Sequence, residues 1–528
     1  MYNPPHNNSN TQRLAERWNP GGIYMQAFVD FMNGIIWSPA LIYLCLGAGL
    51  FYSILTRFVQ VRMFGEMWRL LFSGKSSESG ISSFQALAVS LSGRVGTGNI
   101  AGVAAAIGFG GPGAVFWMWV VAFLGAATAY SESTLAQIYK EEDEGQYRGG
   151  PAYYFEKALG QKWYAWLFAI ATIIACGLML PGVQSNSIGN AVATAFGTGT
   201  MIETGMGDLS SAKIMTGTVV VLILGFIIFG GVKRIAKFTE VVVPFMALAY
   251  IIIACVIIAL NLEQLPGIIA MIFEDAFTPM AGMGAAIGWG VKRGVYSNEA
   301  GQGTGPHAAA AAEVEHPAQQ GLVQAFSVYI DTLFVCSATA FMILITGAYN
   351  VHGAGDAFLV QNLAADAAAN SPMFTQTAIE SVLPGVGNPF VAFALFFFSF
   401  TTILAYYYIA ETNVAYIQRT LKIPGLMMAL KIAIMASTFY GAIKTANLAW
   451  GLGDVGVGLM AWLNIVGILM IFFMAKPAIK ALKDYEAQRK AGVKHYTFDP
   501  VKLGIKNAHF WEKRSGNVSA DKKEKETA

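Results

Sequence analysis

Apolar runs long enough to cross a membrane alternate with short polar segments along most of the chain. A spanning helix needs about 20 mostly apolar residues. Eleven segments meet this requirement: 33–56, 82–108, 113–139, 163–196, 213–230, 239–261, 281–305, 318–347, 388–418, 425–447 and 455–475. The pattern therefore predicts an all-α integral membrane protein with about eleven transmembrane helices.

The composition supports this prediction. Hydrophobic residues make up 55% of the 528 residues and charged residues only 12%, about half the charged share of a typical soluble domain. A net charge of +2 does not indicate a nucleic-acid partner. The four cysteines stand singly in apolar segments, unlike those of a disulfide framework or a metal cluster.

Lysine and arginine are distributed unevenly among the loops. The loops after the first, third, fifth and ninth segments are rich in them, whereas 262–280 and 348–387 contain none. Positive charge marks the cytoplasmic side of a membrane protein. The chain is therefore expected to have its N-terminus outside and its C-terminus inside.

Two of the eleven segments are interrupted by glycine. The stretches are SGRVGTGNIAG, 92–102, and IGWGVKRGVYSNEAGQGTG, 287–305. Glycine destabilises a helix by about 1 kcal/mol relative to alanine, and unwound backbone at membrane depth is tolerated only where it faces protein or a water-filled cavity. Once the first segment is set aside, each stretch opens one set of five, and such matched breaks are typical of inverted-repeat transporters.

This repeat predicts five regions along the chain. They are an extracytoplasmic segment, an extra helix with its cytoplasmic loop, the first five-helix repeat, the second repeat and a cytoplasmic tail: 1–32, 33–80, 81–262, 263–476 and 477–528. Each break would expose amide N–H groups suited to a carboxylate, and carbonyls suited to Na⁺ or an ammonium group. A zwitterionic amino acid and a coupling cation would together use both.

A nucleotide-binding loop is the competing explanation of the first break. After Gly96-Thr97-Gly98 the third glycine, Gly102, comes one residue late for the dinucleotide fingerprint. No alternating strands and helices surround the stretch, and no Gly-Lys-Ser/Thr follows it. The pattern therefore favours a broken membrane helix.

Several stretches resemble the alanine/glycine:cation symporters, which include the sodium:alanine symporters of bacteria and archaea. They are GGPGAVFWMWVVAFLG at 110–125, GTGNIAGVA, GWGVKRGVYSNEAGQGT and FSFTTILAYYY at 398–408. The resemblance implies a leucine-transporter-type fold, a five-plus-five inverted repeat with one extra N-terminal helix. It also implies a cofactor-free transporter of the prokaryotic cytoplasmic membrane, not an enzyme, that takes up alanine or glycine, with serine a further candidate, together with Na⁺.

The resemblance also suggests substrate-binding residues. The backbone amides of Thr97 and Gly98 would hold the substrate carboxylate, and Asn99 either contacts a ligand or ties the unwound segment together. Gln184, beside Pro181-Gly182, would contact the substrate amine or carboxylate. The Gly288-Trp289-Gly290 stretch would form the second break, with the tryptophan as a wall that limits substrate size.

A sodium site without a carboxylate is implied as well. Its five expected ligands are three carbonyls and two hydroxyls, from Ser92, Val95, Phe398, Thr401 and Thr402. The alternative for the two threonines is a hydrogen bond to their own helix, which is common in membranes.

Three cations within the apolar segments need partners, because an unpaired charge at the bilayer centre costs roughly 2.5–3.5 kcal/mol. For Arg94, Lys292 and Arg293 we expect pairing with Glu132, Glu299, Asp331 or Glu411, or exposure to a cytoplasmic vestibule. The stretch HAAAAAEVEH, 307–316, is expected to be a loop without a metal, since its spacing is not that of a zinc protease. A proton-coupled symporter is the nearest alternative function; an ion channel and a membrane enzyme are more remote.

Overall fold

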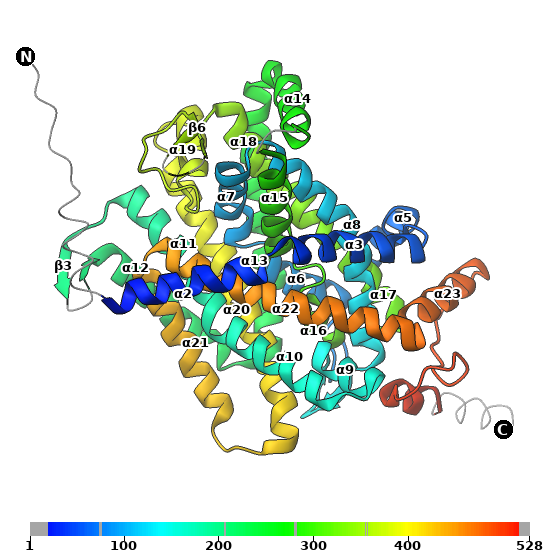
Figure 1. Ribbon diagram of the computed structural model, residues 1–528. Helices are drawn as coiled ribbons and strands as arrows, with labels where there is room; N and C mark the ends of the chain where they lie inside the picture. Colours follow the sequence, from blue (N-terminus) through cyan, green and yellow to red (C-terminus); the bar gives the residue numbers. More distant parts are fainter. Residues whose placement is uncertain are drawn as a thin grey trace, which may run out of the picture.

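The computed structural model describes residues 20–72, 76–204, 207–278, 282–353, 355 and 357–516. The predicted N-terminal segment before residue 20 and the lysine-rich end beyond residue 516 lie outside the described residues. Helices make up most of the molecule (Figure 1). Three antiparallel hairpins join helices: β1 (Glu141–Asp143) with β2 (Gln146–Arg148), β3 (Met201–Thr204) with β4 (Gly207–Ser210), and β5 (Asn350–His352) with β6 (Phe358–Gln361).

The first predicted span is a bent pair of helices. α2 (Pro20–Ile36) and α3 (Pro39–Leu55) meet at 44°, because Pro39 has no N–H to continue the α2 ladder. α2 also begins well before the predicted start at 33. Figure 1 shows the pair running end to end along the later helix α22.

The two predicted sets of five follow in order. The first set is α6 (Ser83–Arg94), η1 (Thr97–Asn99) and α7 (Ala101–Gly110); α8 (Gly113–Ile138); α10 (Lys162–Ile174), η2 (Ala175–Met179) and α11 (Leu180–Phe196); α12 (Ser211–Ile228); and α13 (Gly231–Leu260). The second set is α15 (Gly282–Asn298) and α16 (Gly305–Ala311); α17 (Pro317–Val328), η4 (Tyr329–Cys336) and α18 (Ser337–Thr346); α20 (Gly387–Leu421); α21 (Leu426–Ile443); and α22 (Ala446–Ala475).

Short helices fill the connections, and few of them were expected from the sequence. They are α4 (Val59–Arg62), α5 (Phe64–Leu71), α9 (Pro151–Leu159), η3 (Leu262–Gln264), α14 (Leu265–Ala276), α19 (Met373–Val382) and α23 (Pro477–Lys490). Their amphipathic or polar sequences lack the long apolar run by which the spans were predicted.

Length and composition agree with a membrane bundle. Among the described residues, eight helices are long and apolar enough to span a membrane, and the bent α2–α3 pair makes a possible ninth. The other two predicted spans are α6–α7 and α15–α16, whose separate pieces are too short to qualify alone. Interruption therefore accounts for the difference from eleven.

Local sequence explains where helices start and loosen. Ser82 and Gln85 form a capping box at the start of α6, each side chain bonding the other's backbone N–H at 3.1 Å. Within the fourth span, the π-helical turn η2 lies directly before Pro181. Proline cannot donate to the preceding turn and clashes with it, which accounts for the loosened helix at this point.

The second break lies elsewhere than predicted. α15 is continuous through Gly288-Trp289-Gly290, so the prediction that the helix unwinds there is wrong. The chain leaves the helix ten residues later, where Glu299, Gly301 and Gly303 have φ values of 56°, 82° and 85°. Gly290 instead allows close packing, since an added Cβ would lie 2.5 Å from the Ala114 carbonyl of α8.

The stretch that follows the break is also different from its prediction. His307 lies in the short helix α16, and the predicted loop is reduced to residues 312–316 between α16 and α17. Alanine favours helix, and four of the five consecutive alanines at 308–312 lie in α16.

Candidate substrate and ion site

The first break is held open by its own asparagine. Asn99 Oδ1 accepts a hydrogen bond from the Gly96 amide at 2.8 Å, and Asn99 Nδ2 donates to Asp331 Oδ1 at 2.6 Å. Of the two alternatives for Asn99, the structure thus contains the tie within the unwound segment, and direct contact with a ligand stays a prediction.

Gln184 from α11 reaches the same break. Its Oε1 accepts a hydrogen bond from the Thr97 amide at 3.0 Å, while the Thr97 hydroxyl bonds Ser187 at 2.5 Å. Among the described residues the Gly98 amide has no such acceptor. Of the two amides predicted to bind a carboxylate, Gly98 is therefore the one that can donate without a rearrangement.

Four oxygens converge where α20 crosses the first break. The Thr402 hydroxyl lies 2.8 Å from the Ser92 carbonyl, 2.9 Å from that of Phe398 and 3.5 Å from that of Val95. One hydroxyl proton can serve only one of these acceptors at a time. The cluster is therefore rich in oxygen and poor in protons, which suits a small hard cation.

Thr401 is placed differently from Thr402. Its hydroxyl donates to the Phe397 and Phe398 carbonyls of its own helix at 2.9 and 3.0 Å, and lies 3.9 Å from the sulfur of Met246 on α13. The structure thus brings four of the five predicted sodium ligands together. The role of Thr401 stays a prediction.

Two aromatic residues that sequence reasoning missed lie closest to the first break. A Cβ at Gly98 would lie 3.3 Å from the Tyr296 ring, whose centroid is 5.0 Å from that of Trp450. The Trp450 indole N–H is buried without a partner among the described residues, and the Tyr296 hydroxyl faces Gln184, so both groups are placed to bond a bound ligand. Tyr296 could have been found from its position just before the Glu299 turn, but Trp450 has no local signal in α22.

Trp289, the predicted wall of the substrate site, packs against α7 and not against the first break. It stacks on Phe109 of α7 with centroids 4.7 Å apart. On α15 it precedes Tyr296 by seven residues, so the two share a helix face about two turns apart. The structure does not bring Trp289 to the first break, and its contact with substrate stays a prediction.

The cations of α15 pair with an acid outside the predicted set. Arg293 forms a bidentate bond with Asp454 of α22 at 2.9 and 2.8 Å, and Lys292 lies 2.7 Å from the same carboxylate. The expected partners Glu132, Glu299, Asp331 and Glu411 are thus wrong for these two cations. The guanidinium of Arg293 also lies 4.6 Å from the Trp450 ring centre. The Arg293–Asp454 pair therefore lies directly beside the Tyr296 and Trp450 rings.

Arg94 is buried without a direct ion pair. It donates to the Gln324 carbonyl at 3.1 Å and to the Ser327 hydroxyl, both on α17. Within the described residues no carboxylate comes within 4.0 Å of it. Three of the expected carboxylates, Glu299, Glu132 and Asp331, nevertheless act on its charge electrostatically without a direct ion pair. Its hydrogen bonds join the first break to α17.

Two buried carboxylates organise the breaks. Asp331 accepts hydrogen bonds from Asn99 and from Ser297 of α15, at 2.6 and 3.1 Å. Glu132 of α8 accepts from the Gly301 amide at 3.1 Å and from Asn464 at 2.6 Å. Asp331 thus links the two broken helices, and Glu132 fixes the unwound part of the second.

Comparison with known proteins identifies the family. The sequence model of the sodium:alanine symporter family matches residues 23–500. The chain belongs to this family. It is 50% identical, over 84% of its length and 97% of the relative's, to the sodium/proton-dependent alanine carrier protein of Bacillus sp. (strain PS3). It is 60% identical, over 93% and 98%, to YrbD of Bacillus subtilis (strain 168), whose description as such a carrier is provisional.

A solved structure supports the fold. The crystal structure of MhsT in complex with L-phenylalanine has a TM-score of 0.51 and 12% identity, covering 76% of this chain and all of that chain. The protein is therefore a membrane transporter with a leucine-transporter-type fold, as predicted, and not an enzyme.

Proposed function

We propose that the protein is a Na⁺-coupled symporter that takes up alanine or glycine by alternating access. The observation that carries the proposal is the oxygen cluster of Ser92, Val95, Phe398 and Thr402. It lies beside Gly96, whose amide neighbours offer donors to a carboxylate, so a cation and an amino acid would bind to one unwound segment. Uptake would be into the cytoplasm of a prokaryote, with the N-terminus outside.

The coupling would follow from the position of the cluster. A Na⁺ ion among these oxygens would hold α6 against α20 and so fix the backbone that presents Gly98 to the substrate. Each ligand would then favour the conformation that the other requires, which is a coupling free energy between two sites. The same small site would be saturable and reversible, as transport demands.

The side chains around the break support a small substrate. Tyr296 and Trp450 form a wall beside Gly98, and a Cβ at Gly453 would lie 2.6 Å from Val183 and 3.6 Å from the Tyr296 hydroxyl. Such packing leaves little room for a large side chain. Because a size filter of one methyl group discriminates only by about 10- to 200-fold, serine stays a candidate beside alanine and glycine.

Proton coupling is the second candidate, and Asp331 favours it. This carboxylate is fully buried, joins both broken helices and can carry a proton. Ionisable residues within membrane bundles often mark ion pathways. If Asp331 supplied the coupling ion, an inward proton gradient would drive uptake in the absence of Na⁺.

Substitution at Thr402 tests the cation cluster. Thr402→Ala removes the one side-chain ligand that reaches both helices, so the Na⁺ concentration for half-maximal uptake should rise about tenfold, since a bond to a charged group contributes roughly 1.5 kcal/mol or more. Thr402→Ser keeps the hydroxyl and should stay close to the parent. Thr412→Ala is the matched control, because its buried hydroxyl donates to its own helix at Tyr408. An unchanged Na⁺ requirement in Thr402→Ala would remove the cluster from the mechanism.

A further inference from the structure

The ends of the two broken helices are joined on the side where the C-terminus lies. Ile81, which precedes α6, forms a parallel β-bridge with Ala312, which follows α16. The Ile81 amide donates to the Ala311 carbonyl at 3.0 Å, and the Glu313 amide donates to the Ile81 carbonyl at 2.8 Å. In the proposed orientation this bridge lies across the cytoplasmic exit between the two halves of the site.

The segment after this bridge is held by the C-terminal part of the chain. Glu313 pairs with Arg514 at 2.7 Å, and Glu315 accepts from the Tyr496 amide at 2.9 Å. His316 accepts the Ala318 N–H on Nδ1, so its proton is on Nε2, which lies 3.2 Å from the Asp484 carboxylate. Three of the four histidines and glutamates of the 307–316 stretch, Glu313, Glu315 and His316, are thus docking points, whereas the His307 ring contacts Asn413 of α20.

A buried tryptophan, Trp511, anchors the C-terminal part of the chain to α8. Trp511 is 1% exposed, and its indole N–H donates to the Gln137 carbonyl at 2.7 Å. The Gln137 side chain in turn donates to the Ala309 and Ala312 carbonyls at 2.5 and 3.0 Å. The Lys140 ammonium also donates to the Ala312 carbonyl, at 2.9 Å, and lies 4.6 Å from the ring centre of Phe510.

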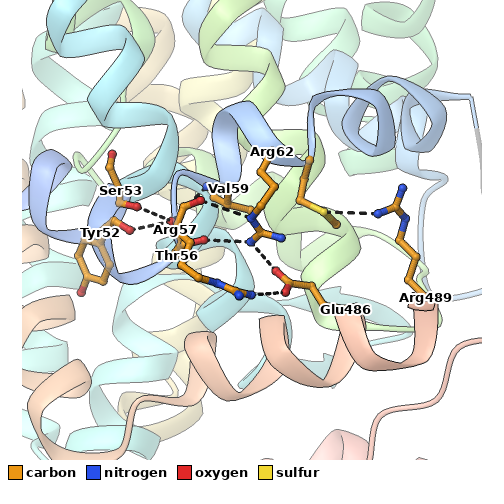
Figure 2. A network of polar contacts seen from close by, with 9 residues as sticks. Tyr52, Ser53, Thr56, Arg57, Val59, Arg62, Glu486 and Arg489 are labelled. Atoms are coloured by element: carbon orange, nitrogen blue, oxygen red, sulfur yellow. Dashed lines mark hydrogen bonds and ion pairs between the residues drawn. The ribbon is translucent and has the colours of Figure 1, made fainter. Parts of the chain in front are cut away.

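The other end of the C-terminal segment is fastened to the loop after α3. Figure 2 shows Glu486 of α23 bridging Arg57 and Arg62 at 2.5 and 2.6 Å. The preceding residue of α23 makes a further contact: the Tyr485 hydroxyl donates to Glu66 of α5 at 2.5 Å. The segment therefore spans from the extra N-terminal helix to the exit of the second broken helix.

We infer that residues 477–516 form a latch that holds the cytoplasmic exit closed and must loosen before substrate is released. We name this segment the C-terminal latch. The inference rests on the proposed function, because an exit is defined only for a transporter. Its contacts fall on residues 313–316 and on α8, so a movement that parts α6 from α16 has to break or carry them.

The latch is built for reversible release. A cavity of about 710 Å³ lies beside it, lined by the β1–β2 hairpin, Glu313 and the side chains of Phe510 and Arg514. The Glu313–Arg514 pair is partly exposed, at 19% and 38%, so each such contact is weak. Opening would therefore separate these weak ion pairs together with buried side chains of the segment, among them Tyr485, Phe498 and Trp511.

Cysteine accessibility tests the latch without reference to the transported ion. Ser90 of α6 is 3% exposed, and its hydroxyl would lie 3.8 Å from a Cβ at Gly305 of α16, so Ser90→Cys should react with a maleimide only when the exit opens. Labelling is read at position 90 by peptide mass spectrometry, which leaves the native cysteines in place. Arg514→Glu in this background should speed labelling about two- to fivefold.

A charge-swapped double variant and a truncation of the latch complete the experiment. Adding Glu313→Arg to Arg514→Glu should return labelling toward the parent rate, whereas Lys506→Ala, an exposed change in the same segment, should leave it unchanged. Removal of residues 491–528 should speed labelling about tenfold or more, because the Trp511 anchor is lost; a thermal melt confirms that this variant is folded. Unchanged or slower labelling in Arg514→Glu and in the folded truncation would overturn the latch. Faster labelling with Na⁺-independent uptake would keep the latch and reject the proposed coupling.

Discussion

The absence of a side chain at Gly96 sets the geometry of the site. A Cβ there would clash with the Thr402 hydroxyl and would lie 2.9 Å from Gln184 Oε1. Its φ of −141° is open to any residue, so close approach, not backbone conformation, requires the glycine. The unwound segment can therefore meet α11 and α20 at one point only because this position is bare.

Alanine substitutions distinguish this glycine from those of the predicted second break. Gly96→Ala should abolish detectable Na⁺-dependent uptake or lower it by at least about tenfold, because overpacking costs typically 1–3 kcal/mol. Gly288→Ala meets nothing within 4 Å and lies in a continuous helix, so uptake should stay within about twofold. Initial uptake rates, normalised to reconstituted protein, make the comparison. An equal loss of uptake in both variants would contradict the continuous helix at residue 288 and favour the predicted unwound segment there.

At the scale of elements, long apolar runs predicted the spans well. The apolar centres of the predicted spans and the first break lie where hydropathy and glycine density placed them, although α2 and α22 begin well before their predicted starts. The second break was displaced because glycine serves two purposes: Gly290 admits the Ala114 carbonyl of α8, whereas Gly301 and Gly303 supply positive φ. Composition alone does not separate these uses.

Contacts between helices that are far apart in the chain could not be predicted from local sequence patterns. Asp454 and Arg293 are 161 residues apart in sequence. They meet because α15 and α22 both pack around the break. Trp450 reaches the break in the same way. By contrast, Thr402, Ser92 and Val95 were found because the resemblance carried both contacting stretches at once.

The Asp454 pair should matter for stability as well as for transport. Asp454→Asn leaves Lys292 and Arg293 buried without an anion, and breaking a buried ion pair typically costs about 3–5 kcal/mol. The thermal unfolding temperature in detergent should therefore fall clearly. The control is Glu263→Gln, an exposed change in η3 that should leave the temperature unchanged. A temperature equal to the parent's in Asp454→Asn would show that the cations have other partners.

At the scale of the whole molecule, the C-terminal segment reaches the loop after α3 on the side of the proposed cytoplasmic exit. α23 and the chain after it lie at one end of the molecule, opposite β3 (Figure 1). They contact the loop after α3 through Glu486, and the α16–α17 connection through Arg514. The C-terminal segment is thus connected to the loop of the extra N-terminal helix and to the chain that follows the second broken helix.

Acidification should release this end of the molecule. Burial opposes ionisation of Glu313, but the Tyr147 hydrogen bond and the Arg514 charge outweigh it and lower its pKa below the ordinary 4.5; the pKa of Glu66 is likewise lowered, by Arg69 and Tyr485. A carboxyl whose pKa is lowered by docking stabilises the docked state above its ordinary value and loses this as pH falls through the lowered pKa. Hydrogen exchange of peptides covering Trp511, corrected for intrinsic rates, should therefore be faster at pH 3.5 than at pH 6. Equal protection at both values would contradict the charge contribution.

The proposed function depends on coupling of amino-acid uptake to Na⁺ at the first break. Labelled L-alanine uptake into proteoliposomes with an imposed inward Na⁺ gradient measures it most directly, with K⁺ replacing Na⁺ on both sides and an inward proton gradient as the parallel conditions. We expect concentrative uptake with Na⁺ alone, its loss with K⁺, and no uptake driven by protons without Na⁺. Uptake of equal rate and extent without Na⁺ would contradict this expectation, and uptake driven by the proton gradient would assign the coupling to Asp331 instead.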